Sequence, residues 1–114
     1  VSLIGPSGER ECPTGFTEIN EQYCIETSEN ATATWFNAVV TCINKKAELP
    51  TWAEWYGAAA VSTSLINTSD NWEWLNDGGD DDSDYAKVVG NGDITNHSSQ
   101  PTSSLQAYRC IYKK

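Results

Sequence analysis

Four cysteines in a chain of 114 residues constrain its fold more than any other feature of the sequence. They are Cys12, Cys24, Cys42 and Cys110, none of them in a Cys-x-x-Cys pair, and the single histidine is His97. Zinc sites need closely spaced pairs of ligands, which this spacing does not provide. We therefore expect two disulfides and an oxidising compartment. Four cysteines allow three pairings, and the spacing alone leaves all three open.

The charge of the chain excludes two classes of partner. Sixteen acidic residues against seven basic ones give a formal net charge of −9. A groove that follows phosphates needs clustered Lys and Arg, and an acidic surface is repelled by anionic lipid headgroups. The apolar runs are also far shorter than the roughly 20 residues of a membrane-spanning helix. We therefore expect neither nucleic-acid binding nor membrane insertion.

The first eleven residues differ from the rest of the chain. Gly5-Pro6-Ser7 and Gly8-Glu9-Arg10 are two Gly-x-y triplets, the repeat of a collagen triple helix. Residues 1–11 are therefore interpreted as a linker or as the end of a stalk, and an upstream stalk would make the protein a homotrimer. Residues 12–114 are expected to form one domain, since a domain typically has about 150 residues.

The first half of this domain has the pattern of a hairpin followed by two helices. Apolar residues flank the polar stretch 20–22, which predicts a hairpin with Cys12 and Cys24 on its arms, where a bridge is geometrically easy. After the cap-rich stretch 30–34, apolar spacings of three and four predict a helix whose buried face includes Cys42. Thr51-Trp52-Ala53-Glu54 fits a capping box and begins a second helix. The expected buried stripes are Trp35, Phe36, Val39, Val40 and Ile43 in the first helix and Trp52, Trp55, Tyr56, Ala59 and Ala60 in the second.

The second half is typical of strands separated by polar loops. Residues 72–75 and 85–89 favour strands, and Trp72 and Trp74 share one side of theirs, which we expect to be buried. Residues 76–84 and 93–104 are polar and are expected to be loops, and Asn91-Gly92 predicts a turn. Residues 105–112 alternate well enough to form the last strand. Helices and strands that are segregated along the chain favour the α+β class.

Several segments resemble the C-type lectin fold. Cys12-Pro13-Thr14-Gly15-Phe16, a helix ending in Cys42 and Tyr108-Arg109-Cys110 are similar to the frame of that fold. More narrowly, segment 48–56 resembles the Leu-Pro-Thr-x-x-Glu-Trp signature of the sulfatase-modifying, formylglycine-generating enzyme group, and segment 70–74 resembles its Asn-x-Trp-Glu-Trp. The same variant occurs in the variable proteins of diversity-generating retroelements and in fibre tips of phages and bacteria. The resemblance implies two helices packed on a small, mostly antiparallel sheet with long polar loops.

The resemblance also implies a disulfide pairing and a function. It pairs Cys12 with Cys24 and Cys42 with Cys110. It implies a non-catalytic recognition domain, extracellular or on a cell or virion surface, which serves as the adhesive tip of a fibre or surface protein and binds a cell-surface glycan or protein. The ligand would contact the polar loops 76–107, where the residues suited to hydrogen bonds are Asn76, Asp77, Tyr85, Asn91, Asp93, Asn96, His97, Gln100 and Gln106.

Two other functions are alternatives. Formylglycine-generating enzymes use a pair of late cysteines to handle copper, oxygen and a substrate thiol, but this chain has no cysteine between Trp74 and Tyr108. A thiolate nucleophile needs a free cysteine, so this metal-assisted enzyme is the less favoured alternative. The other alternative is a purely structural cap on a trimeric stalk.

One acidic segment is a candidate calcium site. Calcium takes about six to eight hard oxygen ligands, and the carboxylates between positions 77 and 84 can supply several. A solvated loop held open by the repulsion of like charges explains the same residues, and we favour that interpretation. The resemblance adds Asp70 and Glu73 as lesser candidates. The candidate ligands in the segment are Asp77, Asp80, Asp81, Asp82 and Asp84.

Overall fold

Two β-sheets and two helices make up the part of the chain that the computed structural model describes, residues 11–78 and 84–114. The smaller sheet is antiparallel and has the order β1 (Phe16–Glu18), β2 (Tyr23–Glu26), β8 (Ile111–Lys113). The larger sheet has the order β3 (Asn30–Ala33), β7 (Gln106–Tyr108), β4 (Glu73–Gly78), β5 (Tyr85–Val89), β6 (His97–Pro101). Its neighbouring strands are antiparallel except β4 and β7, which are parallel. The expected α+β class is confirmed, with two sheets in place of one.

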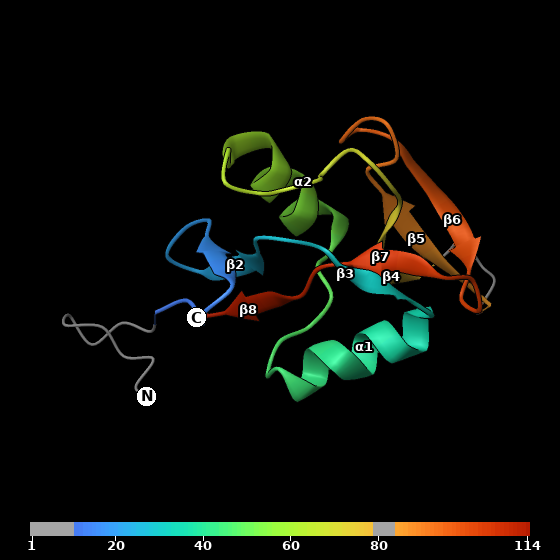
Figure 1. The fold of residues 1–114 in the computed structure, drawn as a ribbon, viewed down its shortest axis with the longest axis horizontal. Coiled ribbons are helices and arrows are strands. Elements are labelled where there is room, and N and C mark those ends of the chain that lie inside the picture. The colour runs from blue at the N-terminus through green and yellow to red at the C-terminus, as the bar shows by residue number, and fades with distance from the viewer. Residues whose placement is uncertain (1–10, 79–83) are drawn as a thin grey trace.

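Strands from the beginning and the end of the chain pair in the smaller sheet. β2 lies between β1 and β8, so the predicted hairpin is confirmed and the C-terminal strand closes on it (Figure 1). One disulfide joins Cys12 to Cys24 on β2, and the other joins Cys42 to Cys110. This is the pairing that the family resemblance implies. The two ends of the domain are therefore fixed both to each other and to the first helix.

The two helices cover opposite sides of the larger sheet (Figure 1). Neighbouring residues of a strand point to opposite faces. On β4, Trp74 accordingly packs in one buried cluster with Cys42 of α1 (Trp35–Asn44), while Leu75 packs in the other with Trp55 of α2 (Trp52–Val61). The sheet thus separates two cores, one under each helix.

Side-chain caps begin both helices where the sequence predicts them. The hydroxyl of Thr34 accepts a hydrogen bond from the backbone N–H of Asn37 at 3.3 Å. Thr51 and Glu54 form the complete capping box, with bonds of 3.2 Å to the threonine hydroxyl and 2.8 Å to the glutamate carboxylate. These local signals satisfy backbone N–H groups that have no partner inside the helix.

The expected buried stripes of the helices are partly wrong. In α1, Ala38 and Cys42 are buried, whereas Phe36, Val40 and Ile43 are exposed. The disulfide from Cys42 turns that side inward, and the apolar residues of α1 cover more of its surface than the buried side alone. In α2, Trp55 and Ala58 are buried while Tyr56 and Ala60 lie outside.

Three segments expected to be polar stretches or loops form strand instead. Residues 30–33 are β3, residues 76–78 extend β4, and residues 97–101 are the edge strand β6. Each is stabilised by backbone pairing with a neighbouring strand, which needs no apolar side chains. β4 also carries a register irregularity between Trp74 and Gly78. Because backbone pairing stabilises them, none of the three segments shows the alternation of apolar and polar residues by which a strand is recognised in a sequence.

The expected last strand, 105–112, is two strands in different sheets. β7 ends at Tyr108 and β8 begins at Ile111. Between them, Arg109 forms a buried ion pair with Glu73 and Cys110 forms the disulfide with Cys42. The chain crosses from the larger to the smaller sheet at these two residues. β5, in contrast, spans the predicted residues 85–89.

Loop length predicts which disulfide stabilises the fold more. The Cys42–Cys110 bridge spans 68 residues and the Cys12–Cys24 bridge spans 12. Chain-entropy arguments give about 4 kcal/mol for the longer loop and about 3 kcal/mol for the shorter. Urea unfolding should therefore show a larger loss of stability in the Cys42→Ala/Cys110→Ala variant than in Cys12→Ala/Cys24→Ala. The opposite order would contradict the entropic account.

Candidate functional site

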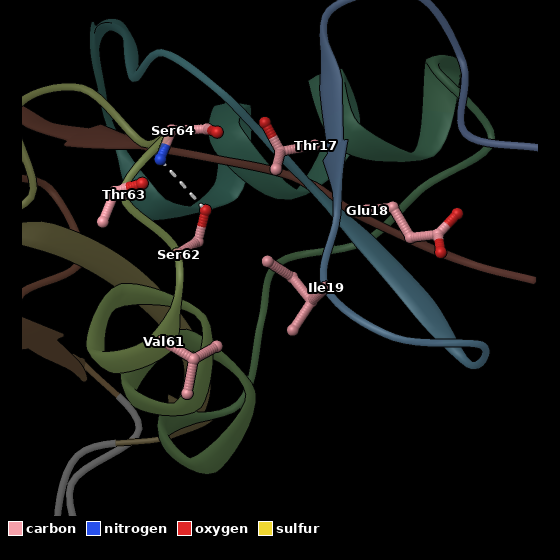
Figure 2. A pocket seen from close by; sticks show the side chains of 7 residues that line it. All are labelled: Thr17, Glu18, Ile19, Val61, Ser62, Thr63 and Ser64. Atoms are coloured by element: carbon pink, nitrogen blue, oxygen red, sulfur yellow. Dashed lines mark hydrogen bonds between the residues drawn. The ribbon is translucent and has the colours of Figure 1, made fainter.

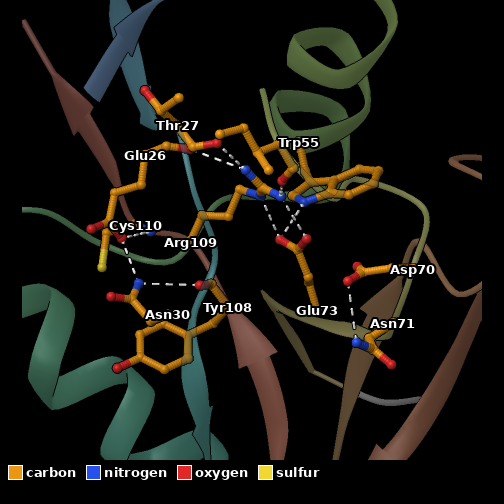
Figure 3. Close-up of polar contacts among 11 residues, drawn as sticks. Glu26, Thr27, Asn30, Trp55, Asp70, Asn71, Glu73, Tyr108, Arg109 and Cys110 are labelled. Carbon is orange, nitrogen blue, oxygen red and sulfur yellow. Dashed lines mark hydrogen bonds and ion pairs between the residues drawn. The ribbon is translucent and has the colours of Figure 1, made fainter. Parts of the chain in front are cut away.

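A buried ion pair holds the centre of the molecule. Both side chains of Glu73 on β4 and Arg109 after β7 are fully buried, and they meet through two bonds, Nε to Oε1 at 2.8 Å and Nη2 to Oε2 at 3.1 Å (Figure 3). The indole N–H of Trp55 also donates to Oε1, at 3.0 Å. Burial raises the pKa of Glu73, and the guanidinium of Arg109 opposes that rise. The remaining guanidinium donors bind the backbone carbonyls of Glu26, Thr27 and Ile66.

Glu26 is a second buried anchor. Its Oε1 accepts bonds from the backbone N–H of Cys110 at 2.6 Å and from the amide of Asn30 at 2.7 Å (Figure 3). Its Oε2 accepts from Nζ of Lys45 at 2.8 Å. The amide of Asn30 also donates to the carbonyl of Tyr108 at 3.1 Å. The carboxylate therefore joins β2, β3, the end of α1 and the Cys42–Cys110 disulfide.

Glu29 and Asp70 form an acidic pair beside this frame. The negative charge of Asp70 acts on Glu29, and Oε2 of Glu29 is a buried oxygen with no hydrogen-bond partner among the described residues. Burial, followed by the charges of Glu73 and Asp70, raises the pKa of Glu29 to about 7, although Arg109 acts in the opposite direction. Glu29 is therefore partly protonated at neutral pH.

Two of the predicted ligand residues contact the aromatic ring or backbone of Trp52. The ring centroids of Trp52, at the start of α2, and His97, at the start of β6, lie 4.3 Å apart. Asp77 accepts a 3.4 Å bond from the backbone N–H of Trp52, and the N–H of Asn76 donates to the carbonyl of Pro50 at 2.7 Å. Asp77 and His97 thus contact Trp52, which was expected to be core and is only half-buried, while Asn76 is held nearby through its backbone alone. We call Trp52, Asp77 and His97 the Trp52–His97 face.

The histidine of this face has a defined hydrogen-bonding state. Nδ1 of His97 lies 3.3 Å from the carbonyl of Thr95. A carbonyl only accepts hydrogen bonds, so Nδ1 carries the hydrogen in this contact. Nε2 of the neutral ring is then an acceptor. The face therefore presents an aromatic surface next to a carboxylate and a ring nitrogen.

The connection 90–96 uses several predicted ligand residues to hold its own shape. Oδ1 of Asp93 accepts from the N–H and the hydroxyl of Thr95, at 2.8 and 2.9 Å, and these bonds lower the pKa of Asp93. The amide of Asn96 donates to the carbonyl of Asn91 at 2.6 Å. Gly90 has a φ of +95°, and an added Cβ would lie 2.8 Å from the carbonyl oxygen of Thr68.

The remaining predicted ligand residues lie elsewhere. Tyr85 begins β5, opposite Pro101 at the far end of β6. Gln100 pairs with Ala86, which belongs to the core under α1, so it points to the face opposite His97. Gln106 lies on β7 and donates to the hydroxyl of Ser104 at 3.3 Å. The predicted residues therefore divide among both faces of the sheet and do not form one surface.

A shallow groove that the sequence does not announce lies between β1 and the end of α2. Its volume is about 270 Å³, and Figure 2 shows hydroxyl side chains on both sides of it. In the sequence, the only sign of this groove is the run of serine and threonine residues that follows α2. A groove of the same volume lies beside Tyr23, where Lys113 binds Glu48 at 2.9 Å and Glu54 at 3.4 Å. The residues of the first groove are Thr17, Glu18, Ile19, Val61, Ser62, Thr63 and Ser64.

The calcium candidates are only partly within the described structure. Asp80, Asp81 and Asp82 lie outside the described residues. Asp77 binds the start of α2, and both carboxylate oxygens of Glu73 are taken by Arg109 and Trp55. Among residues 11–78 and 84–114, no cluster of His, Cys, Asp or Glu has an arrangement suited to a metal ion. Within the same ranges, no helix is long and apolar enough to cross a bilayer.

Solved structures identify the fold, whereas sequence comparison does not. No protein-family model matches the chain, and no curated protein sequence matches it. The CTLD of mouse CD72a has a TM-score of 0.65 at 13% identity, over 90% of this chain and 93% of that one. EMS16, an antagonist of the collagen receptor integrin alpha2beta1, has a TM-score of 0.64 at 16% identity, over 90% of this chain and 100% of that one.

A third structure belongs to the same fold. The C-type lectin domain of murine dendritic cell inhibitory receptor 2, in complex with an N-glycan, has a TM-score of 0.58 at 14% identity, over 91% of this chain and all of that one. At such low identities the likeness shows the fold alone. The described chain has a C-type lectin-like fold, in which two helices pack on antiparallel and mixed sheets.

Removal of the buried carboxylate should be costly. Glu73→Gln leaves the charge of Arg109 buried without its partner, which is expected to lower the free energy of unfolding by about 3–5 kcal/mol. The matched control is Glu48→Gln, which breaks the exposed pair of Glu48 with Lys113 and should cost less than about 1 kcal/mol. Urea unfolding measures both. Equal losses would show that the buried pair does not have its proposed structural role.

The raised pKa of Glu29 predicts a pH dependence of stability. The folded state binds the proton of Glu29 more tightly than the unfolded state, whose glutamate has the ordinary value of 4.5. This contribution is fully present below pH 4.5 and is lost as the pH rises through about 7. Because the site is partly solvated, we expect an effect of only about 1–2 kcal/mol.

The measurement compares the wild-type chain with Glu29→Gln. Urea midpoints at pH 5 and pH 8 give the pH-dependent loss for each protein, and the wild type should lose more. Carboxylates remote from Glu29 titrate alike in both proteins, so their contribution cancels, whereas any change at Asp70 or Glu73 is part of the Glu29 effect because these charges act on Glu29. An identical loss in the two proteins would exclude Glu29 as the source.

Proposed function

We propose that this domain is a non-catalytic recognition module that binds a cell-surface glycan through the Trp52–His97 face. The observation that carries the proposal is the ring pair of Trp52 and His97, 4.3 Å apart, beside Asp77. Aromatic rings offer apolar contact area, and the neighbouring carboxylate and ring nitrogen suit hydrogen bonds to hydroxyl groups. The proposal therefore places the ligand at one face beside α2, which is a smaller region than the predicted loops 76–107. A surface protein is the other class of ligand, and the experiment below separates the two.

The setting follows from the frame of the domain. Two disulfides fit an oxidising, extracellular location. We propose that residues 12–114 form the recognition domain and residues 1–11 a linker or the end of a stalk, so that the domain is the adhesive tip of a fibre or surface protein. The finer resemblance to the retroelement variable proteins and fibre tips belongs to the same proposal. In these settings many tips act together, so weak binding by each tip suffices.

The enzymatic alternative needs a free cysteine, and this chain has none. All four cysteines are joined in disulfides, so none is available as a thiolate or as a soft-metal ligand. The sulfatase-modifying motifs fall instead on structural elements. Thr51 and Glu54 cap α2, and Glu73 binds Arg109. This observation favours recognition over thiol-dependent catalysis.

A glycan array with the multimerised domain tests the proposal. A glycan found there should bind the isolated domain in calorimetry, and His97→Ala should weaken binding about tenfold because it removes one ring and one ring nitrogen from the face. The matched control is Gln100→Ala, three residues further along β6 and on the opposite face. Both residues lie on the edge strand, so neither substitution removes a buried core side chain.

Three results would count against the proposal. Equal losses in both variants would place the ligand elsewhere. An array without binding would exclude the glycan, and the surface protein would then be the ligand class to pursue. Binding that needs an added metal ion at a site remote from Trp52 would contradict the assigned face.

A further inference from the structure

The chain contains three Asn-x-Ser/Thr sequences, the acceptor motif for N-linked glycans in a eukaryotic secretory pathway. They begin at Asn30, Asn67 and Asn96. The motif alone does not separate an acceptor from a chance match, because all three sites contain it. The fold does separate them. A glycan adds a bulky group to the side-chain amide nitrogen, so it needs an asparagine whose amide is exposed and holds nothing else in place.

Asn30 is part of the frame of the domain. Its amide donates to Oε1 of the buried Glu26 at 2.7 Å and to the carbonyl of Tyr108 at 3.1 Å (Figure 3). Its oxygen accepts a bond of 3.0 Å from Nζ of Lys45. Both amide hydrogens are therefore used, and a glycan on this nitrogen would replace one of them. Glycosylation of Asn30 is incompatible with this network.

Asn96 holds the shape of the connection 90–96. Its amide donates to the carbonyl of Asn91 at 2.6 Å, although the residue itself is exposed. The next residue is His97, whose ring packs against Trp52. A glycan at Asn96 would disturb the bond that shapes the chain leading to His97. This asparagine therefore already has a structural role.

Asn67 differs from both. It is exposed, and its side-chain amide makes no hydrogen bond with any residue in the ranges 11–78 and 84–114. It lies in the segment between α2 and β4, which is yellow in Figure 1, and its φ is +60°. Asparagine is one of the few residues with a side chain that adopt this left-handed conformation readily. Ser69, whose hydroxyl completes the motif, is exposed as well.

The backbone on both sides of Asn67 is anchored. The carbonyl of Ile66 accepts a hydrogen bond from the guanidinium of Arg109. On the other side, the carbonyl of Ser69 accepts from the N–H of Gly92 at 2.9 Å. These bonds use backbone carbonyls, so a group attached to the amide of Asn67 leaves them in place. Ile66 is also 50% exposed, and a solubilising glycan on the next residue would cover part of this apolar surface.

We propose that Asn67 is an N-glycosylation site, and that it alone of the three asparagines carries a glycan in the folded, secreted domain. The inference rests on the proposed extracellular setting and takes the chain as a surface protein secreted through a compartment that transfers N-glycans. The donor is a glycan carried on a lipid pyrophosphate. The amide nitrogen of Asn67 forms a bond to the anomeric carbon of the first sugar and loses one proton. The bond from that carbon to the pyrophosphate oxygen breaks, and the lipid pyrophosphate leaves with the electron pair.

Secretion of the 114-residue chain from cultured animal cells, behind a signal peptide, tests the proposal. Mass spectrometry before and after digestion with an N-glycosidase, which converts a glycosylated asparagine to aspartate, identifies the occupied sites. The wild type should carry one glycan, on Asn67. Ser69→Ala should abolish it, because this variant removes the hydroxyl of the motif but keeps Asn67 in its left-handed conformation. Asn67→Asp should abolish it too, since aspartate also tolerates that conformation.

The matched controls remove the other two motifs and keep their asparagines. Thr32→Ala, at an exposed position of β3, removes the motif of Asn30, and Ser98→Ala removes that of Asn96. Both controls should carry the same glycan as the wild type. The urea midpoint of the wild type should also be the same with and without its glycan, because the amide of Asn67 takes no part in the fold. Near-UV circular dichroism checks that each secreted variant is folded.

Three results would overturn the inference: a folded, secreted chain without a glycan, a glycan on Asn30 or Asn96 in that chain, or the loss of the glycan in either control. A urea midpoint that changes when the glycan is removed would contradict the statement that Asn67 has no structural role. The masses are measured on the protein without any ligand, so this test and the array experiment fail independently.

Discussion

The bidentate pair of Glu73 and Arg109 links parts of the chain that are far apart in the sequence. A guanidinium has five N–H donors in a fixed plane, and burying it without partners is strongly unfavourable. Here its donors reach the carboxylate on β4 and backbone carbonyls at the end of β2 and in the segment that follows α2. The carbonyls of Thr27 and Ile66 lie outside the strands, and Arg109 supplies them with hydrogen bonds. The smaller sheet, the larger sheet and the segment after α2 therefore depend on the same side chain.

Arg109 and Cys110 divide the interior of the domain. Arg109 binds Glu73, which in turn accepts the indole N–H of Trp55 on α2, while Cys110 is joined to Cys42 on α1. Adjacent residues on one extended segment thus attach to opposite helices. This explains why the chain leaves the larger sheet at this point, and why α1 and α2 each cover a separate core. The sequence Tyr-Arg-Cys, which contributes to the family resemblance, is in physical terms a connection between two layers.

Local signals in the sequence predicted the fold more accurately than the site. The capping box at Thr51 depends on residues three apart and was confirmed, and the hairpin with Cys12 and Cys24 was confirmed as well. β3 and β6 were missed because their stability comes from backbone pairing with β7 and β5, which leaves no mark in polar side chains. The same omission caused an error in the predicted site. With residues 97–101 taken as loop, His97 and Gln100 were assigned to one surface, although strand geometry places them on opposite faces.

For a related reason, the helical spacing of Trp52 could not show whether its side chain is buried or at the surface. The same stripe contains Trp55, which is buried against Glu73, and periodicity does not distinguish the end of a stripe from its centre. Only the tertiary contact with His97 shows that Trp52 belongs to a surface. The same kind of error occurs on α1, where Phe36, Val40 and Ile43 were expected to be buried and are exposed. The two helices then give the domain two different outer sides. The side of α2 carries the ring of Trp52 beside His97, whereas the outer side of α1 is apolar and uncharged.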